Sequence, residues 1–338
     1  MKFLEILQKA IVCKWSDIHL TTDKNIYYRQ NNRLNIWEDE FFIREDFREV
    51  IENTLNETQK MLFRQNKVID YAYEFNNRRF RINIYMIYKG YGMAIRLIND
   101  NVKPIKNFYQ QKVLRDILHN DNGLILICGA TGTGKSTTLA SMIEYINQNK
   151  SKHIITLEEP IEYVFTNKKS LIHQREYHVD FENFSEAIKM AMRQDPDVIM
   201  VGEIRDTETM KACLNAAETG HLVLGTLHAS SVIEAIMRME SFFNQEQIEA
   251  ISMQIASSLN SIIIQKLIST IDENLVCCMD ILLATTAVKN LISKNQLSQL
   301  ISQMQLNRQN GMQFIQDDIE KLVKAKLIDE KIAKKYIG

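Results

Sequence analysis

This chain has few of the features that mark disulfide-stapled, membrane-spanning or nucleic-acid-binding proteins. Of its 338 residues five are cysteine, none of them in a C-x-x-C pair, so neither a zinc site nor a disulfide framework is indicated. Its apolar runs are shorter than the roughly 18 residues that a membrane span needs. The first ten residues include Glu5 and Lys9, unlike a signal peptide. The formal net charge is −1, so no basic field points to nucleic acid. We therefore expect a cytoplasmic protein.

The rest of the composition is ordinary for a globular chain, and its length predicts two domains. Residues 1–100 alternate short strand-like and helical pieces, typical of a small α+β domain. A polar stretch that contains Pro104, residues 101–110, is predicted to be a linker. Residues 111–270 alternate buried strands with helices, which predicts a parallel α/β sheet. Residues 271–338 hold one further strand and a helical tail.

A glycine-rich segment lies between an apolar run, Leu124–Cys128, and a helical pattern. This strand–turn–helix order with the spacing G-x-x-x-x-G-K-S predicts a P-loop, whose backbone N–H groups and helix N-terminus bind phosphates. Lys135 is expected to reach the β- and γ-phosphates, and the Ser136 hydroxyl to bind Mg²⁺. We therefore predict ATP and Mg²⁺ as cofactors. The predicted nucleotide-binding residues are Gly129, Ala130, Thr131, Gly132, Thr133, Gly134, Lys135, Ser136 and Thr137.

Carboxylates follow two of the predicted strands. The cluster Glu158–Glu162 comes after the strand that starts at His153, and Glu203 follows the strand Val198–Val201 with Gly202 between them. Carboxyl ends of parallel strands converge on the ligand crevice of an open α/β sheet. Glu203 therefore looks like a variant Walker B residue that holds Mg²⁺ through water or polarises the attacking water. A surface carboxylate is the alternative for each of them.

Histidines and arginines complete the candidate site. His228 follows the predicted strand 222–226 at its carboxyl end, where it would sense the γ-phosphate. His221 precedes the same strand, so its position favours a structural or interface role. Phosphoryl transfer also needs positive charge on its transition state. The arginines that could supply it are Arg79, Arg81, Arg96, Arg193, Arg205 and Arg238, and position alone does not choose among them.

Together these motifs resemble one family, the secretion ATPases of type II and type IV pilus systems. Within it the likeness is greatest to the retraction motors of the PilT type. The matching stretches run in order along nearly the whole chain. They are Ser16–Leu20, Arg79–Asn83, Gly129–Ser136, Glu158–Tyr163, Gln174–Glu176, Arg193–Asp197, Gly202–Asp206 and Ala216–His228.

The resemblance implies a PAS-like N-terminal domain joined to a RecA-like P-loop ATPase domain with a helical tail, assembled as a homohexamer. ATP hydrolysis would move one domain against the other and power pilus retraction and twitching motility. The implied partner is an inner-membrane pilus platform protein, with no nucleic acid involved. The ring would thus lie at the inner face of the cytoplasmic membrane and associate with it only through partners.

The resemblance also implies residue roles at matching positions. Glu162 belongs to an acidic box near the active site, and Glu203 is the Walker B glutamate. His228 forms a histidine box with His221, and Arg81 and Arg96 match N-terminal-domain arginines that reach towards nucleotide. The predicted catalytic residues are therefore Glu203, Glu162, His228, Arg81 and Arg96, with Ser136 and Glu203 at the metal.

One C-terminal motif departs from the family pattern. Retraction motors read Ala-Ile-Arg-Asn-Leu-Ile-Arg where this chain has Ala287–Ser293, so Lys289 and Ser293 replace two arginines. Lysine keeps the charge but loses the planar fork. An accessory motor of the PilU type, or an ATPase of a divergent type II/IV secretion system, therefore stays open. A nucleic-acid-stimulated RecA-like motor and a non-hydrolysing scaffold are the alternatives from other classes.

Overall fold

The computed structural model describes residues 2–30, 33–98, 102–272 and 274–337. It divides into two compact units, of which the first comprises Met1–Asn101 with Pro160–Val164 and the second the remainder. Residues 99–101, where the predicted domain boundary and the start of the predicted linker fall, lie outside the described residues. Within the described part of the chain, no helix combines the length and the apolar character that crossing a bilayer requires.

The first unit is built on a six-stranded antiparallel sheet in the order β3-β2-β1-β6-β5-β4. Burial alternates along β5, where Phe80, Ile82 and Ile84 are buried and the residues between them are not. The buried face forms one core with Phe3 and Leu7 of the first helix. This is the α+β arrangement that the sequence predicts. Its elements are α1 (Lys2–Cys13), β1 (Asp17–Thr21), β2 (Lys24–Gln30), β3 (Arg33–Phe42), α2 (Arg44–Thr54), α3 (Glu57–Asn66), β4 (Val68–Phe75), β5 (Arg78–Ile87) and β6 (Gly90–Leu97).

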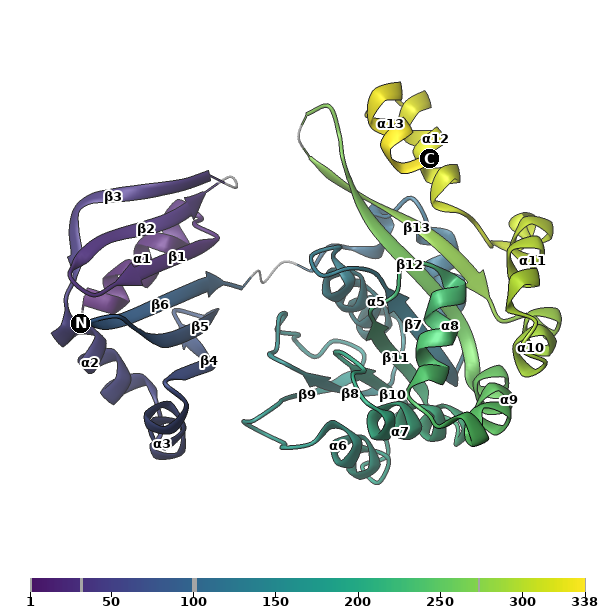
Figure 1. Ribbon diagram of the computed structural model, residues 1–338, viewed down its shortest axis with the longest axis horizontal. Helices are drawn as coiled ribbons and strands as arrows, with labels where there is room; N and C mark the ends of the chain where they lie inside the picture. Colours follow the sequence, from purple (N-terminus) through teal and green to yellow (C-terminus); the bar gives the residue numbers. More distant parts are fainter. Residues whose placement is uncertain (1, 31–32, 99–101, 273, 338) are drawn as a thin grey trace. The chain divides into compact units, whose positions relative to one another are not determined.

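The second unit is built on a seven-stranded sheet in the order β13-β12-β7-β11-β10-β8-β9, parallel except for β13 (Figure 1). Its strands are β7 (Gly123–Cys128), β8 (His153–Glu158), β9 (Leu171–Glu176), β10 (Val198–Val201), β11 (Leu222–Leu227), β12 (Leu259–Ser269) and β13 (Leu275–Leu283). Its α-helices are α4 (Gln111–Ile117), α5 (Lys135–Asn149), α6 (Phe184–Ala191), α7 (Thr207–Glu218), α8 (Val232–Ser241), α9 (Ile248–Ser258), α10 (Thr286–Ser293), α11 (Leu300–Leu306), α12 (Ile315–Lys324) and α13 (Glu330–Ile337).

The central strands of this sheet are buried on both faces. Along β7, Leu124 and Leu126 pack into one hydrophobic core with residues of α6 to α9, whereas Ile125 and Ile127 pack into another with residues of α4 and α5. Such double coverage explains why β7, β10 and β11 read as continuous apolar runs. The carboxyl ends of β7, β11, β10 and β8 all lie at one edge, where the candidate residues follow.

Two strands of this sheet were not predicted. β9 lies at the sheet edge and has only Ile172 and Glu176 buried, so it lacks the apolar run of its neighbours. β12 starts directly after α9, at Leu259, with no loop between helix and strand, and its apolar run begins only at Ile262. Periodicity alone does not separate a buried helix from a buried strand in such a run.

Candidate active site

The segment Gly129–Gly134 joins β7 to α5 as a tight loop, and Lys135 and Ser136 open the helix. Gly129, Gly132 and Gly134 have φ angles of 153°, 81° and 84°, a region that glycine enters without steric cost. At Gly129 a Cβ would also lie 2.7 Å from the carbonyl oxygen of Gln265. No side chain caps the N-terminus of α5, so its first N–H groups lie beside this loop as donors for an anion.

Lys135, the first residue of α5, folds back over the loop. Its Nζ donates to the carbonyl oxygens of Gly129 at 2.8 Å and Ala130 at 3.0 Å. The Thr133 hydroxyl donates to the same Ala130 oxygen at 2.9 Å. The ammonium group is therefore held against the loop by its carbonyl oxygens, where a phosphate bound by the loop N–H groups could replace them as its partner.

Glu203 lies two residues beyond β10 and contacts two basic side chains. Its Oε2 accepts a hydrogen bond from Nη2 of Arg205 at 2.8 Å, and its Oε1 lies 3.1 Å from Nε2 of His228. Arg205 also donates through Nη1 to Oε2 of Glu159 at 2.6 Å. Arg205 therefore bridges the carboxylates that follow β8 and β10, and His228 joins the group from the end of β11.

These contacts decide the charge of Glu203. Burial by itself would raise the pKa of its carboxyl, but the hydrogen bond from Arg205 and the charges of Arg205, His228 and Lys135 together hold the pKa below its ordinary value. Glu203 is therefore ionised at neutral pH. The charge of Lys135 acts on it because the P-loop and Glu203 share one edge of the sheet.

The two histidines of β11 have different surroundings. Near the carboxyl end, the hydroxyl of Thr226 donates to the carbonyl oxygen of Gly202 at 2.6 Å, which ties the Glu203 loop to the strand that positions His228. His221 precedes the opposite end of the strand, and its Nδ1 lies 3.0 Å from the carbonyl oxygen of Ala216. The structure therefore places His228, and not His221, with Glu203.

Two further carboxylates near this edge are buried behind the exposed ones. Glu158 accepts hydrogen bonds from the Thr156 hydroxyl at 2.7 Å and from Nε2 of Gln174 at 3.1 Å. Glu176 is also buried, and its backbone N–H donates to Asp180. Glu158 thus links β8 to β9 and supports the segment that carries Glu159.

The other three predicted catalytic residues belong to the first unit. Arg81 and Arg96 lie directly opposite each other on β5 and β6. Like charges in such a pair repel, and each has a carboxylate partner. Nη2 of Arg81 lies 2.7 Å from Asp70, and Nε of Arg96 lies 2.8 Å from Asp17. Within that unit both arginines and Glu162 line a small pocket of about 210 Å³.

Two residues of the site were missed or undervalued from sequence. Gln265 of β12 is buried and bonds to the P-loop, and its signal was a single amide inside the apolar run that starts at Ile262. Arg205 is one of six candidate arginines and lies in the matching stretch Gly202–Asp206, which assigns it no role. Its bond to Glu203 is local, but its bond to Glu159 joins segments 46 residues apart, which no local pattern predicts.

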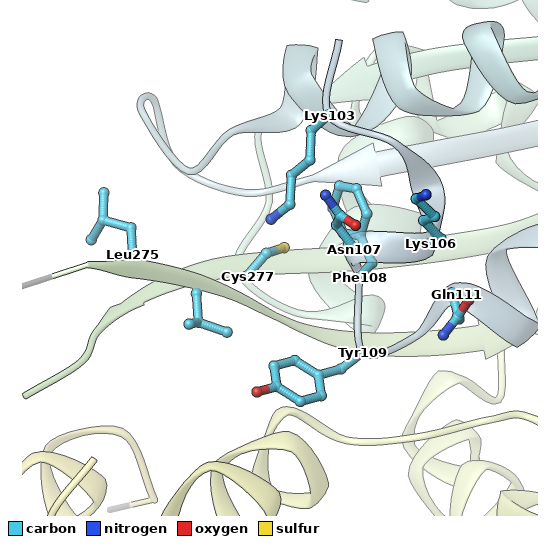
Figure 2. A pocket seen from close by; sticks show the side chains of 9 residues that line it. Lys103, Lys106, Asn107, Phe108, Tyr109, Gln111, Leu275 and Cys277 are labelled. Atoms are coloured by element: carbon cyan, nitrogen blue, oxygen red, sulfur yellow. The ribbon is translucent and has the colours of Figure 1, made fainter. Parts of the chain in front are cut away.

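A pocket of about 460 Å³ lies between the segment that precedes α4 and the start of β13 (Figure 2). The Lys103 ammonium lies 4.6 Å from the centre of the Phe108 ring. Cys277 of β13 pairs with Leu267 of β12, and a Cβ on Gly134 would lie 3.9 Å from the Leu267 side chain. The lining residues are Lys103, Lys106, Asn107, Phe108, Tyr109, Gln111, Leu275, Val276 and Cys277.

Comparison with known proteins places the chain in a family. The model of the type II/IV secretion system protein family matches residues 2–326. A "Twitching motility protein" of Neisseria gonorrhoeae is 38% identical over 293 residues, which cover 86% of this chain and 78% of the relative. The "Type IV pilus retractation ATPase PilT" of Pseudomonas aeruginosa is 38% identical over 286 residues, 84% of this chain and 83% of the relative.

A solved structure agrees with these relatives. The structure titled "Crystal Structure of the Pilus Retraction Motor PilT and Bound ADP" superposes with a TM-score of 0.90 at 39% identity, covering 98% of this chain and 96% of the other. The predicted two-domain α/β fold class is thereby confirmed, as is the resemblance to pilus-retraction ATPases. The chain belongs to the type II/IV secretion system protein family.

Proposed function

We propose that this protein is an Mg²⁺-dependent ATPase motor that powers type IV pilus retraction. One observation carries the proposal. An ionised Glu203, held by Arg205 and His228, lies at the same sheet edge as a P-loop whose lysine faces inwards. The pairing of a phosphate-binding loop with a base near it is what phosphoryl transfer to water requires. The PilT relatives supply the cellular role.

In this proposal the nine residues from Gly129 to Thr137 bind the triphosphate. Backbone N–H groups of the loop and of the α5 N-terminus contact the phosphate oxygens, and Lys135 leaves its two carbonyl partners for the β- and γ-phosphates. The nucleoside would occupy the pocket between Lys103 and Cys277, which offers an aromatic ring and cationic side chains. Cys277 of that pocket pairs with Leu267, and the Leu267 side chain lies beside Gly134 of the P-loop.

The donor set also fits Mg²⁺. The hydroxyl of Ser136, in the first turn of α5, and the ionised carboxylate of Glu203 are the hard oxygen ligands that Mg²⁺ prefers, the latter through water. When bound, the ion would neutralise charge on the phosphates. Glu203 orients the attacking water and accepts its proton at a carboxylate oxygen. Arg205 fixes the direction of that carboxylate, and His228 lies where it can respond to the γ-phosphate.

Motion would come from the first unit. Arg81, Arg96 and Glu162 act on nucleotide bound by the second unit of the same or an adjacent subunit, and loss of the γ-phosphate releases them. Successive hydrolysis around a homohexameric ring would deliver torque to an inner-membrane platform protein and disassemble the filament. The ring would work at the inner face of the cytoplasmic membrane without nucleic acid.

The C-terminal motif keeps an accessory motor as a second candidate. Lys289, where retraction motors have arginine, donates from Nζ to the carbonyl oxygen of Ser257 at the end of α9 at 3.0 Å. The hydroxyl of Ser293 bonds only within its own helix, to the Asn290 carbonyl oxygen at 3.1 Å. Neither side chain offers a partner the planar guanidinium that arginine would. The motor would therefore bind the platform protein less tightly, and this is the reason to keep an accessory motor as the second candidate.

The deciding experiment measures steady-state ATP hydrolysis together with molar mass by light scattering, with and without ATP. Turnover that appears with hexamer formation and is lost in Lys135→Ala supports the motor. Nucleotide binding without turnover indicates a scaffold, and turnover by a stable monomer contradicts the ring. Stimulation by single-stranded DNA that falls steeply with salt would instead favour a nucleic-acid motor.

A further inference from the structure

Gln265 lies beside the P-loop although it is more than a hundred residues away in sequence. β12 runs parallel to β7, and the last registered pair joins Ile264 to Cys128. Gln265 therefore comes next along β12, opposite the glycine that opens the loop. The closeness is evident at Gly129, where a Cβ would lie 2.7 Å from the carbonyl oxygen of Gln265.

The side chain of Gln265 joins the two ends of the loop–helix junction. It is 1% exposed. Its Nε2 donates to the carbonyl oxygen of Thr133 at 2.5 Å, and its Oε1 accepts from the Thr138 hydroxyl at 2.7 Å. Because a backbone carbonyl only accepts, the Thr133 contact decides which way the amide faces. Both halves of the carboxamide thus have a fixed partner.

This contact sets the direction of a P-loop donor. A trans peptide group is planar, so its C=O and N–H point in opposite directions. The peptide group between Thr133 and Gly134 turns its oxygen towards Gln265, and its N–H therefore points away from β12. A Cβ on Gly134 would lie 3.1 Å from Nε2 of Gln265, so glycine at this position is what allows the amide to approach.

We infer that Gln265 is a positioning residue that aims the Gly134 N–H at the bound phosphates. The inference rests on the proposed ATP binding and deepens it, because it assigns the orientation of one donor to a side chain outside the loop. The donor contacts phosphate in the ground state and in the transition state alike. Its loss is then a loss of uniform binding, which raises KM and leaves kcat unchanged.

The test compares Gln265→Met with wild type in ATP hydrolysis over a range of ATP concentrations. Methionine keeps the length of the side chain but removes both hydrogen bonds. We expect KM to rise about tenfold, the scale of one lost buried hydrogen bond, with kcat within about twofold of wild type. The stabilisation of the fold by ADP in thermal unfolding should shrink in parallel.

Gln313→Met is the matched control. The Gln313 amide also donates to a backbone carbonyl, that of Met279 on β13, at 3.0 Å, and to Asp318 of α12 at 3.0 Å, and neither partner belongs to the loop. Its removal should leave KM unchanged. A Gln265→Met enzyme with wild-type KM overturns the inference, as does a fall in kcat at constant KM, which is the mark of a smaller active fraction.

If Gln265→Met does not fold, the Gln265→Asn variant tests the role of Gln265 instead. It keeps an amide but shortens it by one methylene, so the amide no longer spans Thr133 and Thr138, and KM should again rise. The two proposals fail separately. Wild-type protein that binds no ATP, or Lys135→Ala protein that binds it equally well, removes the proposed function. A wild-type enzyme that is active while both Gln265 variants keep its KM removes only the role of Gln265.

Discussion

Glu203 has the two properties that a residue acting on water needs, a negative charge and a fixed direction. Replacing it by glutamine keeps the size and the hydrogen bond from Arg205 but removes the base. We predict that Glu203→Gln binds ATP as wild type does and loses about 10²–10⁴ in kcat. Glu208→Gln, at an exposed carboxylate on α7, is the control and should hydrolyse normally. Unchanged turnover in Glu203→Gln would contradict the assigned role.

Arg205 controls when Glu203 is ionised. Burial raises the pKa of Glu203 and Arg205 lowers it, so in Arg205→Gln the pKa should rise. A base must be deprotonated to act, and the acid limb of the kcat profile should therefore move to higher pH. The lowered pKa of Glu203 also affects the stability of the fold in a pH-dependent way. A carboxyl with a lowered folded pKa stabilises the fold above its unfolded value of 4.5 and loses that contribution as the pH falls below it.

The measurement for Arg205→Gln is kcat against pH, with Lys211→Gln as control. Lys211 forms an exposed ion pair with Glu208 on α7 and does not contact the site. Its acid limb should match that of wild type. An acid limb that stays in place in Arg205→Gln would mean that Arg205 has no effect on the titration of Glu203.

Single residues could be predicted where a strand or a loop places them. Lys135, Glu203 and His228 each follow an apolar run, and the rule that parallel strands end at one edge brings them together. The contacts that Arg205 makes to Glu159 and that Gln265 makes to the P-loop could not be predicted. Each joins segments from different strands, and local sequence does not reveal which strands are neighbours in the sheet. The roles assigned to Arg81 and Arg96 came only from the family resemblance.

Among the elements, α12 depends on one buried carboxylate. Asp318 is 1% exposed. Its Oδ2 accepts from the backbone N–H of Met279 and from Nε2 of Gln313, both at 3.0 Å, and from Nε2 of Gln110. Burial raises the pKa of this carboxyl. The group joins the tail helix to β13 and to the segment before α4.

We predict that Asp318→Ala leaves these donors unpaired and lowers the free energy of unfolding by about 2–5 kcal/mol. Asp318→Asn is the matched control, because an amide oxygen can still accept from them, and it should lie within about 1 kcal/mol of wild type. Urea unfolding measures both. Equal stability of the alanine and asparagine variants would show that the donors find other partners.

Helices and strands could be predicted where their burial produces a regular pattern of apolar residues in the sequence. β8 and β10 have the predicted bounds because their apolar runs are flanked by polar turns. β9 was missed since an edge strand needs few apolar residues, and β12 since it follows α9 without a loop and its apolar run from Ile262 is interrupted by Gln265 and Lys266. Both misses concern strands whose identity depends on what pairs with them.

At the scale of the whole molecule, the P-loop lies in the second unit and Arg81 and Arg96 lie in the first. Arg81 and Arg96 form ion pairs in which the arginine side chains are 41% and 65% exposed, while their partners Asp70 and Asp17 are 39% and 15% exposed. An exposed pair contributes only about 0–1 kcal/mol, so Arg96, whose own side chain is exposed, is the arginine that can change partners more easily. Removing them should therefore leave folding intact and report on hydrolysis alone.

We predict that the double variant Arg81→Gln/Arg96→Gln binds ATP within about threefold of wild type, because the P-loop lies wholly in the second unit. Its turnover should fall at least about 100-fold if the arginines stabilise charge on the transferring phosphoryl group, a role worth up to 10³–10⁵ elsewhere. Arg29→Gln is the control, since Arg29 lies in register with Asp17 on the same sheet but matches no nucleotide-reaching arginine. Normal turnover in the double variant would contradict a role of Arg81 and Arg96 in hydrolysis. The proposed domain movement would then have to depend on other residues.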